Sequence, residues 1–211
     1  TDIGLDVEYT EGELTQSQDS ATEGSAFLVE TIPAGKHYDY DVDATLFASF
    51  FTFNWQAERW AISVGGRFES MQYDYTNNMN VGRVREDGTQ CGFGGCRYSR
   101  PADSENDFDN FSPKLSLRYQ LNPQTQLFGG IARGYRAPQA TELYRLQRAQ
   151  TVTDLDSVTA DNIEMGVTGT LFDGSYTLSL YSLQKDNVIY RDSDFFNVSN
   201  GETWHRGVEL T

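Results

Sequence analysis

The stretch WAISVGGRF, residues 60–68, alternates two kinds of side chain with a period of two residues. The large apolar side chains fall on one face of an extended chain: Trp60, Ile62, Val64 and Phe68. The small or polar ones fall on the other: Ala61, Ser63, Gly65 and Arg67. Successive side chains of a β-strand point to opposite faces, so this pattern predicts a strand with one apolar face.

The same alternation recurs in DIGLDVEYT (2–10), PKLSLRY (113–119), NIEMGVTGTL (162–171) and SYTLSLYSLQK (175–185), and predicts about eight strands in all. The connections between them alternate in length. Short ones, with turn-forming residues, are QAER (56–59), QLNPQT (120–125) and FDG (172–174), whereas residues 10–37, 76–110 and 136–160 form long ones. In a meander of strands, short turns then lie at one end and long loops at the other, as in a transmembrane β-barrel.

Composition is compatible with this architecture and excludes others. The 211 residues have no run of about 20 apolar residues, so a helical membrane protein is excluded. The mean hydropathy of −0.55 is ordinary for a barrel whose strands alternate apolar and polar residues. With 31 acidic and 16 basic residues, and a formal net charge of −15, nucleic acid is not an expected partner. Trp55, Trp60 and Tyr119 flank short turns, where aromatic residues gather at a membrane interface.

The two cysteines, Cys91 and Cys96, enclose glycines in CGFGGC, which favours a small disulfide-closed loop and an oxidising compartment. Two free thiols remain the alternative. The two histidines, His37 and His205, are not at metal-ligand spacing, so no zinc site is expected.

Acidic residues alternate in DYDVD (39–43) and ADSENDFDN (102–110), which we expect to lie in long polar loops. Oxygen-rich spacing of this kind could bind calcium, but Phe108 and Lys114 stand where an EF-hand needs Gly and Glu, so solvated loops are favoured. The sequence has no nucleophile elbow and no phosphate-binding loop, so no catalytic residue, no cofactor and no enzyme activity are expected.

Five stretches in order resemble the barrel of TonB-dependent outer-membrane receptors: WAISVGGRFES, FSPKLSLRYQL, LFGGIARGYRAPQATELY, DLDSVTADNIEMGVTGTL, and YSLQKDNVIYR with NVSNGETWHRGVELT. The resemblance covers roughly residues 38–211. It implies an all-β, antiparallel up-and-down barrel of 22 strands, of which this chain supplies about eight. Residues 1–211 are then a partial barrel, and the plug domain is expected to be absent from this fragment.

The resemblance also implies a function. Such receptors import scarce nutrients across the outer membrane of Gram-negative bacteria with energy supplied by TonB, which contacts the missing plug. The implied ligands are small molecules, such as a ferric siderophore, cobalamin or an oligosaccharide, and the implied surroundings are outer-membrane lipid.

Arginines gather where the strand LFGGIA reaches a predicted rim, with Gly134 and Pro138 expected to end it. The candidate ligand-binding residues are Arg133, Tyr135, Arg136, Arg145 and Arg148. One interpretation is an electropositive rim for anionic chelates; the other, which we favour, is structural pairing with acidic loops or lipopolysaccharide phosphates.

Two other classes of protein stay open at this point. One is a secreted or periplasmic β-sandwich that binds carbohydrate or protein, against which the alternation of loop lengths argues. The other is a passive porin-like barrel, against which the series of motifs argues.

Overall fold

The computed structural model describes residues 1–172 and 174–211 and forms one antiparallel sheet with elaborate loops at one end. Its eight strands are β1 (Asp2–Gln18), β2 (Gly35–Ala57), β3 (Trp60–Asn77), β5 (Ser104–Asn122), β6 (Thr125–Arg136), β8 (Val158–Leu171), β9 (Gly174–Arg191) and β10 (Asn197–Leu210). Each strand pairs with the next one in that order. The prediction of about eight meandering strands is therefore confirmed.

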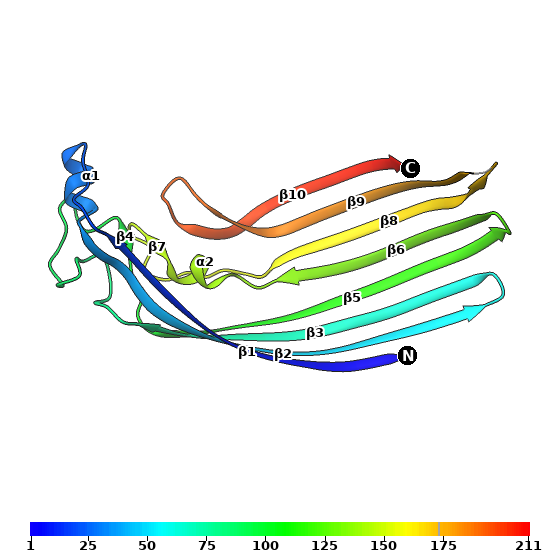
Figure 1. Ribbon diagram of the computed structural model, residues 1–211, viewed down its shortest axis with the longest axis horizontal. Helices are drawn as coiled ribbons and strands as arrows, with labels where there is room; N and C mark the ends of the chain where they lie inside the picture. Colours follow the sequence, from blue (N-terminus) through cyan, green and yellow to red (C-terminus); the bar gives the residue numbers. More distant parts are fainter. Residues whose placement is uncertain (173) are drawn as a thin grey trace.

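Short turns lie at one end of the sheet and long loops at the other, as predicted (Figure 1). The predicted turn FDG includes Asp173, which lies outside the described residues. The loops hold α1 (Ala26–Thr31), α2 (Ala140–Tyr144) and a separate two-stranded sheet of β4 (Tyr98–Ser99) and β7 (Leu146–Gln147). We call the end of the sheet with the short turns the turn end, and the end with the long loops the loop end. In the described part of the chain, no helix is long and apolar enough to cross a membrane.

The strands extend further toward the loop end than predicted, and the prediction that the acidic runs lie in loops is wrong. Residues 39–43 lie in β2, and residues 104–110 lie in β5. The reason is visible in the alternation itself, because Tyr38, Tyr40 and Val42, which alternate with the aspartates of β2, are buried. Period-two patterning continues into these segments, with tyrosines in place of aliphatic residues.

One face of the sheet carries the apolar side chains, and we call it the apolar face. They include Val7, Phe51, Trp55, Trp60, Val64, Leu115, Ile131, Met165 and Leu180, all among the exposed large hydrophobic residues. Cross-strand register continues this face from strand to strand, since Val64 is paired with Phe53 on one side and Leu115 on the other. At the turn end, Trp60 pairs with Tyr119, with ring centroids 4.4 Å apart. A monomer in water rarely exposes so large an apolar surface.

The opposite, polar face carries charged residues such as Arg67, whose guanidinium lies 2.5 Å from Asp6 and 3.1 Å from Glu69. Some glycines on this face, including Gly4 and Gly166, are covered by neighbouring aromatic rings. A Cβ built on Gly166 would lie 2.5 Å from the ring of Phe128 and 2.4 Å from a backbone oxygen. Close contact between strand and ring therefore requires glycine at this position.

Between the apolar face and the loop end, the same side of the sheet carries acidic side chains. Register places carboxylates directly opposite one another, with Glu11 facing Asp43 and Asp74 facing both Asp43 and Glu105. Within the described residues, no three histidine, cysteine, aspartate or glutamate side chains are arranged to hold a metal ion. The apolar face thus ends at a band of solvated charge.

Candidate ligand-binding site at the loop end of the sheet

The polar face ends in a buried cluster of tyrosines at the loop end. Tyr38 and Tyr40 come from β2, Tyr75 from β3 and Tyr144 from α2, and each is at most 3% exposed. The rings of Tyr75 and Tyr144 stack with centroids 4.2 Å apart, and the ring of Tyr40 lies 5.2 Å from that of Tyr75. The loop that contains α2 therefore packs back onto the wall of strands.

Tyr38 joins this cluster to β7, because its hydroxyl donates a hydrogen bond to the carbonyl of Leu146. Burial raises the pKa of Tyr38 from 10.0 to about 12, with nearby Arg145 opposing the shift. The neutral phenol is the form that the folded protein holds.

Alkaline pH is therefore expected to destabilise the loop end. A pKa raised on folding contributes stability that is complete below pH 10 and is lost as pH rises through about 12. Two pKa units correspond to about 2–3 kcal/mol. Denaturant unfolding followed by circular dichroism at pH 9 and pH 11.5 should show this loss, and Tyr38→Phe should show less of it. Equal losses in the two proteins would contradict the assignment.

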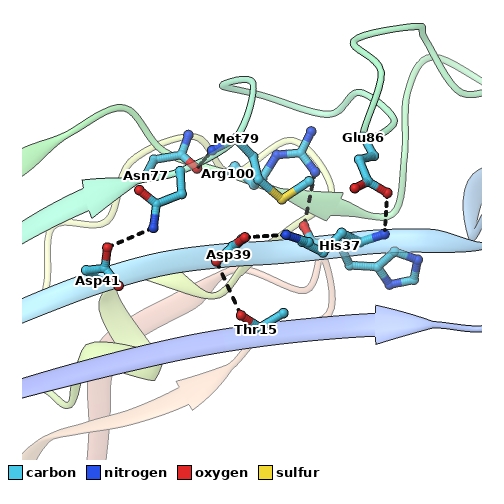
Figure 2. Close-up of polar contacts among 10 residues, drawn as sticks. Thr15, His37, Asp39, Asp41, Asn77, Met79, Glu86 and Arg100 are labelled. Carbon is cyan, nitrogen blue, oxygen red and sulfur yellow. Dashed lines mark hydrogen bonds and ion pairs between the residues drawn. The ribbon is translucent and has the colours of Figure 1, made fainter.

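Arg100 holds the loop of residues 78–103 against β2 (Figure 2). It is 1% exposed and donates to four carbonyls: Asn80 at 2.6 Å, His37 at 3.0 Å, Val84 at 2.6 Å and Arg85 at 3.3 Å. Its guanidinium also lies 5.1 Å from the ring centroid of Tyr98. A buried cation is thus solvated by backbone dipoles.

Polar contacts around Asp39 tie β1, β2 and this loop together (Figure 2). Its carboxylate lies 2.5 Å from Lys36 Nζ and accepts a hydrogen bond from Thr15 at 3.2 Å. The hydrogen bond from Lys36 is the main cause that lowers the pKa of Asp39. Glu86 reaches from the loop to the backbone N–H of Lys36 at 3.0 Å. The loop is therefore fastened to the strands on two sides.

Cys91 and Cys96 form a disulfide, which confirms the prediction and excludes the free-thiol alternative. The ring that they close is hydrogen-bonded to Arg83. The N–H of Cys96 donates to the Arg83 carbonyl at 2.9 Å, and Arg83 Nε donates to the Cys96 carbonyl at 2.9 Å.

Two of the predicted rim arginines form ion pairs with carboxylates of this chain. Arg133 forms a two-pronged contact with Asp161 on the neighbouring strand, at 2.5 and 2.6 Å. Arg136 contacts both carboxylate oxygens of Glu142, at 2.9 and 3.1 Å. Strand alternation places Arg133 on the side of the apolar face and Arg136 on the polar side. β6 continues through Gly134 to Arg136, so the prediction that Gly134 ends the strand is wrong.

The other three candidates each contact different residues. Arg145 donates to Gln16 at 2.9 Å and lies over Tyr38, 5.9 Å from the ring centroid. Arg148 lies over Phe195 at 3.9 Å. Tyr135 lines a separate polar hollow of about 460 Å³ beside β5. The five predicted residues thus make separate contacts, and their role in ligand binding stays a prediction.

Sequence reasoning missed Arg83, Arg97 and Arg100, which come from the long connection between β3 and β5. Alternation in HYDYDVD was the available signal for the buried tyrosines, since apolar-type residues occupy every second position. The arginines carried no such signal, because their grouping depends on contacts between distant loops.

Solved structures share this fold. The chain is similar to the ferric-catecholate import receptor Fiu from E. coli K12, with a TM-score of 0.64, 16% identity, and 99% of this chain and 32% of that chain covered. The ferric yersiniabactin uptake receptor FyuA from Yersinia pestis gives a TM-score of 0.64 and 18% identity, with 99% of this chain and 28% of that chain covered. The copper transporter OprC gives a TM-score of 0.66 and 15% identity, with 99% of this chain and 30% of that chain covered. The chain therefore spans about a third of the length of these structures.

A search of curated proteins gives no match. A family model described as the TonB dependent receptor-like β-barrel matches residues 2–211, which is nearly the whole chain. The resemblance carried by the motifs, the single meandering sheet and this match agree. The chain belongs to the TonB-dependent receptor β-barrel family.

Proposed function

We propose that this chain forms part of the barrel wall of an outer-membrane receptor that imports a scarce nutrient into a Gram-negative bacterium with energy from TonB. The observation that carries the proposal is the exposed apolar face, continuous in register across the strands and bordered by Trp60 and Tyr119 at the turn end. Outer-membrane lipid would cover this face, because the transfer of apolar surface from water to lipid is favourable.

The loop end supports a receptor rather than a simple pore. The loops of two connections, β3–β5 and β6–β8, pack on the buried tyrosines, and Arg100 fixes the first of them to β2, so the loop end forms an ordered surface on which a ligand could bind. The family's plug, and with it the contact to TonB, would be supplied by another part of the full-length protein. We infer a metal chelate, such as a ferric siderophore, as cargo, because two similar structures are named for ferric compounds and one for copper. Cobalamin and oligosaccharide are the remaining candidates.

The test uses the full-length gene product in its own cells. We expect it in the outer membrane as a barrel that requires detergent and migrates differently on gels after heating. Deletion should lower uptake of the cognate ferric chelate under iron limitation, and loss of TonB should lower it equally. Uptake that persists without TonB would favour the porin-like alternative, and a water-soluble protein would favour the sandwich.

A further inference from the structure

Three arginines line one cavity of about 330 Å³ among the loops, at the end of the sheet farthest from the turns. They are Arg83 and Arg97, from the loop between β3 and β5, and Arg148, from the segment after β7. Phe27 of α1 and Phe196 supply apolar walls, and Asp194 is the one acidic residue among those that line the cavity. The cavity is therefore a cationic site in an otherwise acidic chain.

The small sheet places two of these arginines against each other. β4 and β7 pair with Ser99 opposite Leu146 and Tyr98 opposite Gln147, so the next pair is Arg97 and Arg148. The N–H of Arg148 donates to the carbonyl of Arg97 at 2.8 Å, which continues the ladder. Like charges directly opposite on neighbouring strands are destabilising.

The guanidinium groups of Arg97 and Arg148 both lie over the ring of Phe195. Arg148 Cζ lies 3.9 Å and Arg97 Cζ 5.3 Å from the ring centroid of Phe195. Arg148 and Phe195 have φ values of 49° and 69°, in the left-handed region that residues other than glycine rarely adopt. Strain of this kind persists where the surrounding structure imposes it, and it is concentrated at functional sites.

Asp194 lines the cavity, but no carboxylate of the described residues lies within ion-pair distance of these three cations. Within the described residues, the ion pairs at 4.0 Å or less involve Lys36, Arg67, Arg133 and Arg136, and none of the three cavity arginines. Arg148 Nε is buried and has no hydrogen-bond acceptor in the described part of the chain. A buried donor without an acceptor costs folding free energy, and a ligand with an acceptor oxygen would remove that cost.

The third arginine is fixed in place before any ligand arrives. Arg83 donates from Nε to the carbonyl of Cys96 at 2.9 Å and from Nη2 to that of Gly95 at 3.3 Å. Gly95 has φ of +125°, and a Cβ there would lie 2.9 Å from Cβ of Arg83. The disulfide-closed ring thus acts as a rigid support for this guanidinium.

We propose that Arg83, Arg97 and Arg148 form a binding site for a carboxylate or phosphate group of a soluble ligand. Guanidinium groups bind such oxyanions through paired hydrogen bonds. The cavity lies well above the apolar face, because about 40 Å of β2, at about 3.3 Å per residue, separates Phe47 from Gly35. A strand tilted by about 35–45° still rises by about 30 Å over that length. That distance separates the cavity from lipid phosphates, so the ligand reaches it from solution. The inference rests on the proposed function and adds to it the anionic class of the ligand.

The test is calorimetric titration of the full-length receptor in detergent, at low ionic strength, with citrate and with pyrophosphate as probes. We expect saturable binding of at least one probe, weakened at high salt. The double variant R97Q/R148Q should bind at least tenfold more weakly. R85Q removes an arginine of the same loop that does not line the cavity, and it should bind as the unchanged protein does. Heat-dependent gel mobility verifies that each variant is folded.

Three outcomes would overturn the site: no binding of either probe, equal binding by R97Q/R148Q, or an equal loss in R85Q. The relative affinities for citrate and pyrophosphate identify the preferred group. Outer-membrane location and TonB-dependent uptake are measured separately. A receptor that imports its cargo but binds neither anion would therefore contradict this inference and leave the proposed function standing.

Discussion

Replacing Arg100 with alanine is expected to release the loop of residues 78–103 from the wall of strands. The variant removes a buried cation that donates to four carbonyls and leaves those carbonyls to find other donors. Because one hydrogen bond to a charged group contributes about 1.5–3 kcal/mol, the loss should exceed about 3 kcal/mol. The loss should be local, since the strands below are held by their own ladders.

Hydrogen exchange followed by mass spectrometry measures this effect directly. Peptides from residues 78–103 should exchange at least about 100-fold faster in Arg100→Ala, because about 1.4 kcal/mol corresponds to a factor of ten. Peptides from the turn end of β3 and β5 should be unchanged. Arg85→Ala is the matched control, since its side chain takes part in no ion pair within the described residues.

Arg100→Lys separates charge from geometry. Lysine retains the positive charge, but its single ammonium cannot reproduce the planar fork that spans four carbonyls. We expect it to restore only part of the protection. Full protection in either variant would mean that the disulfide and the contact of Glu86 with Lys36 hold the loop without Arg100.

Most of the sheet was predictable from the sequence, because local rules determine it. Alternation in residues 60–68 and 113–119 reports which side chains share a face, and short turns report which strands are neighbours. The loop-end extensions of β2 and β5 were missed because their alternating partners are tyrosine and aspartate. A pattern built from half-polar residues carries little hydropathy contrast, so these segments have the composition of loops.

The candidate site was less predictable, for a geometric reason. Arg133 and Arg136 are close in sequence, but their odd spacing puts them on opposite sides of β6. Arg83 and Arg148 are 65 positions apart, yet they line one cavity. Their proximity depends on the disulfide-closed ring and on the pairing of β4 with β7. Contacts between distant loops of this kind produce no periodic pattern in a single sequence.

Replacing Val64 with arginine should be the most damaging change on the apolar face. Val64 lies midway between Trp60 and Phe68 on β3, with Phe53 and Leu115 beside it. An arginine on the lipid face near the bilayer midplane costs about 2–4 kcal/mol. We expect that loss in urea unfolding of the full-length barrel in lipid vesicles, together with less folded protein in the outer membrane.

Two further variants decide what covers this face. Ser63→Arg changes the adjacent residue on the polar face, where arginine meets water, and it should cost little. Val64→Phe should also be tolerated, because fluid lipid accommodates a larger apolar side chain, whereas a close-packed core loses about 1–3 kcal/mol on such overpacking. If Val64→Phe proves as costly as Val64→Arg, the apolar face packs against protein. A large loss confined to Val64→Arg is the result that only a lipid-facing wall explains.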